Sequence, residues 1–380
     1  MQKTQHFLSS LGGQDQAREN REGTPSRRNF LAGFGALAAA ACISNDDLRA
    51  QAPVPNTRRI DVHHHFATPK GLALAESFKP NGYQVWRGYS AEKALAALDS
   101  AGAATAILSG GIIDQAQSRD VLPANTIPKE IRELNDYGAK LVSEHKGRFG
   151  LWGVLPLPDV DASLREIEYV LDVLKADGVA TRTSYGNKWL GDPAFQPVFD
   201  ELNRRKAVVY THPIDAPCCQ TLIPGVPGTT IEYNTDTSRA IFSLINDAGA
   251  GSGKMSMATR YADVKFIWSH AGGSLLGLVG RFLGNAANGE NIVKTAERNS
   301  KLYHLRRFYY DTAGSATPVE MQALKMLVGV SQILFGSDFP FGNPPVLGIA
   351  QGLQTCGFSE AELRGIAREN ALGLLPRFRT

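Results

Sequence analysis

Cysteine, unbalanced charge and long apolar runs are all scarce in this chain of 380 residues. None of its four cysteines, Cys42, Cys218, Cys219 and Cys356, belongs to a CxxC or CxH pattern, so a sulfur-rich metal site is not expected. Cys218 and Cys219 are adjacent, and such a pair rarely bridges itself without strain. The formal net charge is only +3 and no basic run with interleaved aromatic residues occurs, so nucleic acid is not an expected partner. After residue 50 no apolar run is long enough to span a membrane.

The first part of the chain has the features of an export signal. Residues 1–25 are polar and without periodicity, which is typical of a disordered leader. Ser26-Arg27-Arg28-Asn29-Phe30-Leu31 and the apolar run from Ala32 to Ala41 follow, a pattern similar to a twin-arginine signal. This pattern predicts that the twin-arginine export machinery carries the folded protein to the periplasm. If the signal is not used, the protein stays in the cytoplasm.

The end of this leader has two possible markers. Ala50-Gln51-Ala52 fits a small-x-small cleavage site, although Pro53 would hinder a signal peptidase. Ala40-Ala41-Cys42 weakly resembles a lipoprotein box, which would tether the mature chain through its cysteine. We expect residues 1–52 to be the leader and residues 53–380 to form the folded domain.

Eight short apolar segments alternate with amphipathic segments from residue 57 onward. The expected strands are Arg58–Phe66, Ala104–Ser109, Phe149–Leu157, Gly178–Thr183, Ala207–His212, Lys265–His270, Phe308–Ala313 and Ile333–Asp338. They are continuous apolar runs, as expected of parallel strands that are covered on both faces. Eight successive βα units predict an α/β fold, a distorted (β/α)8 TIM barrel. A doubly wound sheet is the alternative, but it would have a glycine-rich turn where this chain has histidines.

Two connections between the expected strands are long. The first follows strand 1 and spans about residues 67–88. The second follows strand 5 and spans about residues 213–263, with helices expected around Thr237–Ala248 and Lys254–Tyr261. Long loops after barrel strands usually form lids or binding loops, so we expect both to lie near the site.

The first strand ends in three consecutive histidines. Because successive side chains of a strand alternate between its faces, His63 and His65 share one face and His64 takes the other. Two imidazoles placed in this way can bind one divalent cation. Strands 5, 6 and 8 end in His212, His270 and Asp338, and the C-terminal ends of barrel strands meet at one end of the barrel. The joint occurrence at the ends of strands 1, 5, 6 and 8 predicts a mononuclear metal centre.

These strand-end motifs together resemble the amidohydrolase superfamily, and more narrowly its amidohydrolase-2 branch, that of aminocarboxymuconate-semialdehyde decarboxylase. The motifs are His63-x-His65, Thr211-His212-Pro213, Ser269-His270-Ala271-Gly272-Gly273 and Gly336-Ser337-Asp338-Phe339-Pro340. The segment from Thr183 to Pro193, continued by Glu201–Lys206, is more similar to the aromatic-acid decarboxylases near 6-methylsalicylate decarboxylase. The resemblance covers about residues 58–375. It also implies a homodimer, for which the chain offers Leu275, Leu276, Leu278, Val279 and Phe282.

The resemblance implies a role for each residue of the centre. His63, His65, His212 and Asp338 would bind one divalent metal, a donor set that suits Zn²⁺ and tolerates Mn²⁺. Strand 4 lacks the lysine that bridges two metals in other members of the superfamily, which also indicates one metal. Asp338 would donate a proton to the substrate, and His270 would act as general acid or base.

Five further residues are candidates for roles around the centre. Arg182 is placed to bind a second anionic group of the substrate, or to form a structural salt bridge. Tyr185 and Trp189 could stack on an aromatic substrate or anchor their loop. Phe341 could form an apolar wall or belong to the core. Asp311 could orient His270 by accepting its second ring N–H, or cap a helix.

The predicted function is that of a metal-dependent, non-oxidative decarboxylase acting on a small aromatic or unsaturated carboxylic acid. The alternative is a metal-dependent hydrolase of a lactone, amide or ester that uses metal-activated water. The string from Thr183 to Pro193 favours the decarboxylase, and the export signal slightly favours the hydrolase. A non-catalytic binding barrel is the least favoured reading, because all four expected ligands are present.

Overall fold

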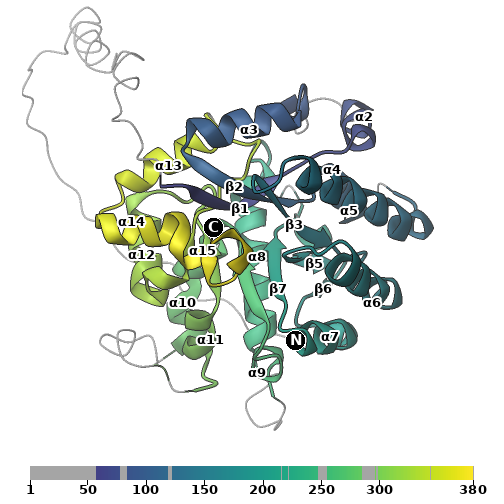
Figure 1. Ribbon diagram of the computed structural model, residues 1–380. Coiled ribbons are helices and arrows are strands. Elements are labelled where there is room, and N and C mark those ends of the chain that lie inside the picture. Colours follow the sequence, from purple (N-terminus) through teal and green to yellow (C-terminus); the bar gives the residue numbers. More distant parts are fainter. Residues whose placement is uncertain are drawn as a thin grey trace, which may run out of the picture. The chain divides into compact units, whose positions relative to one another are not determined.

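The computed structural model describes residues 57–77, 84–118, 122–214, 216–220, 222–246, 255–284, 296, 298–342 and 344–379. The predicted leader, residues 1–52, lies outside them. Eight parallel strands form a nearly closed barrel with helices around it, which confirms the predicted (β/α)8 fold (Figure 1). In spatial and chain order they are β1 (Arg59–His65), β2 (Ala103–Ser109), β3 (Phe149–Val154), β4 (Gly178–Arg182), β7 (Val208–His212), β8 (Lys265–Trp268), β9 (Tyr309–Asp311) and β10 (Ile333–Leu334).

Helices connect the strands. They are α2 (Pro69–Ser77), α3 (Ala91–Ser100), α4 (Ile112–Ser118), α5 (Ile127–Glu144), α6 (Val160–Glu168), α7 (Gln196–Arg204), α8 (Gly228–Ile245), α9 (Met257–Arg260), α10 (Leu275–Leu283), α11 (Lys301–Arg307), α12 (Pro318–Val328), α13 (Leu347–Gln354), α14 (Glu360–Arg364) and α15 (Asn370–Leu372). None of the helices in the described ranges has the length and apolarity that crossing a membrane requires.

The helices pack on the barrel through apolar stripes. In α5, Ile131, Leu134 and Leu141 are buried on one face at helical spacing, and this face packs on β3. Inside the barrel, the Nε1–H of Trp152 on β3 donates to the carbonyl of Val62 on β1 at 2.9 Å. Because β1 and β3 are not neighbours, this indole spans the interior, and its full burial stabilises the fold by about 2 kcal/mol.

The barrel closes between β1 and the chain after β10. The N–H of Val62 donates to Phe335 O and that of His65 to Phe339 O, both at 2.9 Å. The buried carboxylate of Asp61 accepts hydrogen bonds from the backbone N–H and the hydroxyl of Ser337, at 2.9 and 2.6 Å. The expected eighth strand reached Asp338, but its pairing with β9 ends at Leu334 because the following residues turn towards β1.

Two local features differ from expectation. A short hairpin, β5 (Ser184–Tyr185) with β6 (Lys188–Trp189), follows β4, and α8 begins at Gly228, well before the helix expected from residue 237. The buried face of α8 includes the polar Glu232 and Asp236, so apolar periodicity alone did not reveal its first half.

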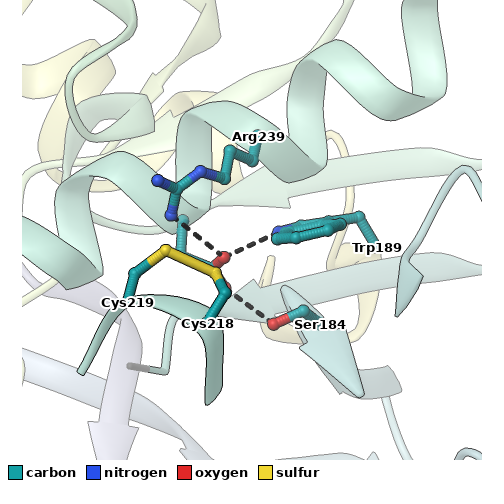
Figure 2. The surroundings of a disulfide bond; sticks show 6 residues. Ser184, Trp189, Cys218, Cys219 and Arg239 are labelled. Atoms are coloured by element: carbon teal, nitrogen blue, oxygen red, sulfur yellow. Dashed lines mark hydrogen bonds and ion pairs between the residues drawn. A yellow bond between two sulfur atoms is a disulfide. The ribbon is translucent and has the colours of Figure 1, made fainter. Parts of the chain in front are cut away.

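Cys218 and Cys219 form a disulfide in the connection after β7, although adjacent cysteines rarely bridge (Figure 2).

Candidate metal centre

Four side chains converge at the C-terminal end of the barrel. Nε2 of His65 lies 3.2 Å from Nε2 of both His63 and His212, and 3.0 Å from Oδ1 of Asp338. One ligand atom from each of the four residues lies within 4.8 Å of all the others, and the three histidines are buried. The structure therefore brings together the four predicted ligands in a group that could hold a metal ion.

His64 lies on the opposite face of β1, as predicted. Its Nδ1 is 2.9 Å from Oδ2 of Asp61, and its ring stacks on Phe339 with 4.3 Å between the ring centres. This histidine therefore belongs to the closure of the barrel and not to the metal centre.

In His63 and His65, the hydrogen bond made by Nδ1 determines where the lone pair of Nε2 points. Nδ1 of His63 lies 2.8 Å from Oδ2 of Asp311, and Nδ1 of His65 lies 2.8 Å from the carbonyl of Gly110. A carboxylate and a carbonyl only accept, so each Nδ1 carries the proton and each Nε2 points a lone pair inwards. These lone pairs and the carboxylate of Asp338 repel one another unless a positive charge lies between them. The donor set therefore fits a divalent cation.

The charges around the centre also favour a cation. Burial lowers the pKa of His63, but the carboxylates of Asp311 and Asp338 outweigh it and raise this pKa to about 10. Burial opposes the ionisation of Asp338, yet the charge of His63 and hydrogen bonds from the imidazoles hold the pKa of Asp338 well below its usual range. Burial lowers the pKa of His65 and of His212. Without a metal, the positive charge of this site is therefore a proton on His63, beside an ionised Asp338 and neutral His65 and His212. A divalent cation would take the place of this proton, because metal binding requires neutral imidazoles.

A cavity of about 380 Å³ opens beside the centre, which is the size of a small-molecule site. Its lining comprises Gln115, His212, Thr229, Tyr233, Asn234, His270, Gly314, Ser315, Glu320, Asp338 and Phe341. Phe341 lies in the cavity wall, with its ring nearly perpendicular to that of His65, and its contact with a substrate stays a prediction. No lysine or arginine is among these described lining residues.

His270 faces the cavity from the turn after β8. Its Nδ1–H donates to the carbonyl of Ala313 at 3.1 Å, which leaves Nε2 as an acceptor. Nε2 is buried and has no hydrogen-bond partner in the described part of the chain. The backbone of His270 is left-handed, with φ of 52°, and its N–H donates to Oδ1 of Asp311 at 2.9 Å. Asp311 therefore holds the backbone of His270 and not its ring, because the ring N–H already binds Ala313.

Arg182 contacts Nδ1 of His212, the ring nitrogen that points away from the candidate metal centre. Its Nη1 is 2.7 Å from Nδ1 of His212, a nitrogen that also lies 2.8 Å from the carbonyl of Pro213. Its Nη2 forms a buried ion pair with Asp114. The guanidinium does not line the cavity, so the structure favours the salt-bridge alternative, and substrate binding by Arg182 stays a prediction.

Tyr185 and Trp189 also lie away from the cavity lining. The hydroxyl of Tyr185 accepts the backbone N–H of Arg182 at 2.9 Å, and Nε1 of Trp189 donates to Asp236 at 2.6 Å. These contacts favour loop anchoring, and stacking on a substrate stays a prediction. Sequence reasoning missed Tyr233, which lines the cavity, and Asp236, because both lie in the first half of α8.

Known proteins match this chain over most of its length. The family model described as amidohydrolase matches residues 60–377. The decarboxylase yanB of Aspergillus niger is 36% identical over 346 residues, covering 84% of this chain and 88% of its own length. The 6-methylsalicylic acid decarboxylase of Penicillium expansum is 31% identical over 342 residues, covering 84% and 97%.

A solved structure supports the fold. The dihydroxybenzoic acid decarboxylase of Polaromonas sp. JS666, with bound manganese and the inhibitor 2-nitroresorcinol, has a TM-score of 0.70 at 20% identity and covers 85% of this chain and 98% of its own. The family match over residues 60–377 includes all four candidate ligands of the centre. The chain therefore belongs to the amidohydrolase family, as its strand-end motifs predict.

Proposed function

We propose that this protein is a metal-dependent, non-oxidative decarboxylase of a small aromatic carboxylic acid with a hydroxyl group beside the carboxylate. The observation that carries the proposal is the convergence of the four ligands beside a cavity whose described lining has no lysine or arginine. A carboxylate substrate would find its counter-charge there in a bound cation. The relatives that match over most of the chain are decarboxylases, which favours this reaction over the metal-dependent hydrolysis considered above.

The residues suited to hold the cation are His63, His65, His212 and Asp338. A divalent cation bound there supplies a Lewis acid that can hold a carboxylate and a neighbouring oxygen. The chain contributes the orientation of the ligands, because the outer N–H groups of His63 and His65 are fixed by Asp311 and Gly110.

Asp338 is the proposed proton donor. Its side chain is 21% exposed, whereas those of His63 and His65 are fully buried, so it is open to the cavity. Asp338, which is ionised in the free site, would first take up a proton from solvent. This proton then adds to the ring carbon that bears the carboxylate. The bond from this carbon to the carboxylate then breaks, its electron pair restores the aromatic ring, and carbon dioxide leaves.

His270 is the proposed partner of the substrate hydroxyl. His270 lines the cavity, and its Nε2 has no hydrogen-bond partner among the described residues, so this nitrogen can accept a hydrogen bond from the hydroxyl and take its proton. The proton held by the imidazolium then stabilises negative charge on the substrate oxygen. Phe341 and Tyr233 offer aromatic surface to the ring of the substrate.

A paired assay tests the reaction class. Purified protein is incubated with salicylate, 6-methylsalicylate and 2,6-dihydroxybenzoate, and separately with lactones and amides. Released carbon dioxide is measured beside the base that hydrolysis consumes, with Asp338→Asn as the control. We expect carbon dioxide from at least one hydroxybenzoate and none from the variant. Hydrolysis without carbon dioxide would contradict the proposal.

We also propose zinc as the resident metal, with manganese as the alternative. Three imidazoles and one carboxylate suit Zn²⁺ and accept Mn²⁺. Mass spectrometry of the metals in protein purified without added metal distinguishes them.

Two further proposals concern the assembly and location of the protein. A homodimer is supported by α10, whose apolar Leu276, Leu278 and Val279 are only partly covered. Light scattering of the purified protein tests it. Export to the periplasm is supported by the pair Arg27-Arg28 ahead of an apolar run, and replacing both arginines by lysine should keep the protein in the cytoplasm.

A further inference from the structure

A buried carboxylate outside the metal centre connects the cavity wall to the loop after β4. Asp236 lies on α8 and is fully buried. Its Oδ2 accepts hydrogen bonds from the hydroxyls of Thr183 and Ser184, and its Oδ1 accepts one from Nε1 of Trp189 at 2.6 Å. Nη1 of Arg239 lies 4.0 Å from Oδ1. Figure 2 shows Ser184, Trp189 and Arg239 directed at this place, beside the disulfide.

The hairpin β5–β6 presents two of these donors together. Ser184 and Trp189 are directly opposite each other in its antiparallel pairing, so their side chains lie on the same face. Its two-residue turn requires a left-handed first residue, and Gly186 supplies it with φ of 60°. The segment after β4 therefore forms a preorganised donor surface for one carboxylate.

The same helix supplies the wall of the cavity. The lining residues that α8 contributes are Thr229, Tyr233 and Asn234. The carbonyl of Asn234 accepts the N–H of Ser274 at 2.9 Å, and a Cβ added at Gly273 would lie 2.1 Å from this carbonyl oxygen. Helix α8 is thus in close contact with the turn that carries His270. Asp236 holds the helix from one side and this turn holds it from the other.

We propose, on the basis of the decarboxylase activity proposed above, that Asp236 is a positioning residue that sets the width of the substrate cavity. Its three hydrogen bonds hold Tyr233 and Asn234 at the distance that fits the ring of the substrate. Loss of the carboxylate would leave buried hydroxyl and indole donors unpaired, and the helix would shift to relieve them. Asp236 therefore acts on substrate affinity and on discrimination between ring substituents, while the metal centre stays intact.

Kinetics of Asp236→Asn test this role. We expect KM for the best hydroxybenzoate to rise about tenfold, because small displacements of a binding wall weaken positioning, while kcat changes less than about twofold. The ratio of kcat/KM for 6-methylsalicylate and salicylate should move towards one, and metal content should stay at the wild-type level. Trp189→Phe and Ser184→Ala each remove one donor, so they should raise KM in the same direction by about threefold. Asp172→Asn removes an exposed carboxylate elsewhere and should leave KM unchanged.

Three outcomes would overturn the proposal. The first is an unchanged KM in Asp236→Asn. The second is a loss of metal and a lower kcat in this variant without a change in KM. The third applies if Asp236→Asn fails to fold, and is an unchanged KM in both Trp189→Phe and Ser184→Ala. A wild-type protein that releases no carbon dioxide would refute the proposed function but not this role. In that case the Kd of 6-methylsalicylate, measured by calorimetry, would test the role of Asp236. We expect Asp236→Asn to bind this acid about tenfold more weakly than the wild type. Equal binding, or none by the wild type, would overturn it.

Discussion

Asp311 and His63 are joined by a hydrogen bond of 2.8 Å between Oδ2 and Nδ1, with both side chains fully buried. The second oxygen of Asp311 accepts the backbone N–H of His270. One carboxylate therefore orients both a candidate metal ligand and a residue that lines the cavity beside the candidate centre. Because such a carboxylate fixes the tautomer of the histidine and raises its basicity, Asp311 should affect metal affinity without touching the metal.

Asp311→Asn should weaken metal binding by about 10- to 100-fold, since the amide is a poorer acceptor for the N–H of His63. Competition with a chromogenic chelator measures this affinity. Asp99→Asn is a suitable control, because Asp99 is 64% exposed and pairs with Arg148 near the start of β2, away from the centre. Equal affinity in wild type and Asp311→Asn would show that the carboxylate does not support the ligand.

His270→Gln should lower kcat by about 10²- to 10³-fold, because the acceptor for the substrate hydroxyl is lost. The metal content should stay unchanged, since His270 lies outside the four ligands. Steady-state kinetics and metal analysis of the same preparation check both statements. Loss of metal together with activity would contradict this division of roles and would place His270 among the ligands.

Asp61→Ala should lower the free energy of unfolding by about 3 kcal/mol. The substitution removes a buried acceptor at the place where β1 meets the chain after β10. The donors that lose it are the N–H of His63, the ring of His64, and the N–H and hydroxyl of Ser337. Urea unfolding of the metal-free protein measures the loss. Asp161→Ala, at an exposed position in α6, should change stability by only a few tenths of a kcal/mol. Equal effects of the two substitutions on the free energy of unfolding would refute the role of Asp61 in closing the barrel.

Two glycine substitutions should differ in sign. A Cβ at Gly191 would lie 2.0 Å from the carbonyl oxygen of Ser243 on α8, so Gly191→Ala should destabilise the protein by about 1–3 kcal/mol. A Cβ at Gly277 in α10 would meet no atom within 4 Å, so Gly277→Ala should stabilise the helix by up to about 1 kcal/mol. Thermal unfolding compares the two, and equal melting temperatures would contradict the close contact at Gly191.

The convergence of the side chains at the candidate metal centre could be predicted from the sequence by simple rules, and the family resemblance then singled out the four candidate ligands. His63 and His65 are two residues apart on a strand, and His212 and Asp338 follow later strands whose C-terminal ends meet at the same end of a barrel. Neither rule depends on side-chain packing.

The surroundings of the centre could not be predicted in the same way. The sequence makes Arg182 a candidate for binding a substrate anion, because it is a cation at the end of a strand. Its ion pair with Asp114 could not be foreseen, because Asp114 lies on a different element, far away in the chain. Asp236 was missed because its helix buries polar groups, which weakens the apolar pattern. Trp189 and Tyr185 could contact either the protein or a substrate, and the sequence does not distinguish the two, whereas their hydrogen bonds in the structure favour loop anchoring.

The most direct test of the central claim is a metal titration of the metal-free protein, followed by carbon dioxide release from a hydroxybenzoate that the wild type consumes. The activity should rise linearly with added Zn²⁺ or Mn²⁺ and reach a plateau at one equivalent per chain, while His212→Ala should gain neither tight binding nor activity. Activity in the metal-free protein, or a plateau at two equivalents, would contradict a single four-ligand centre as the seat of the decarboxylation.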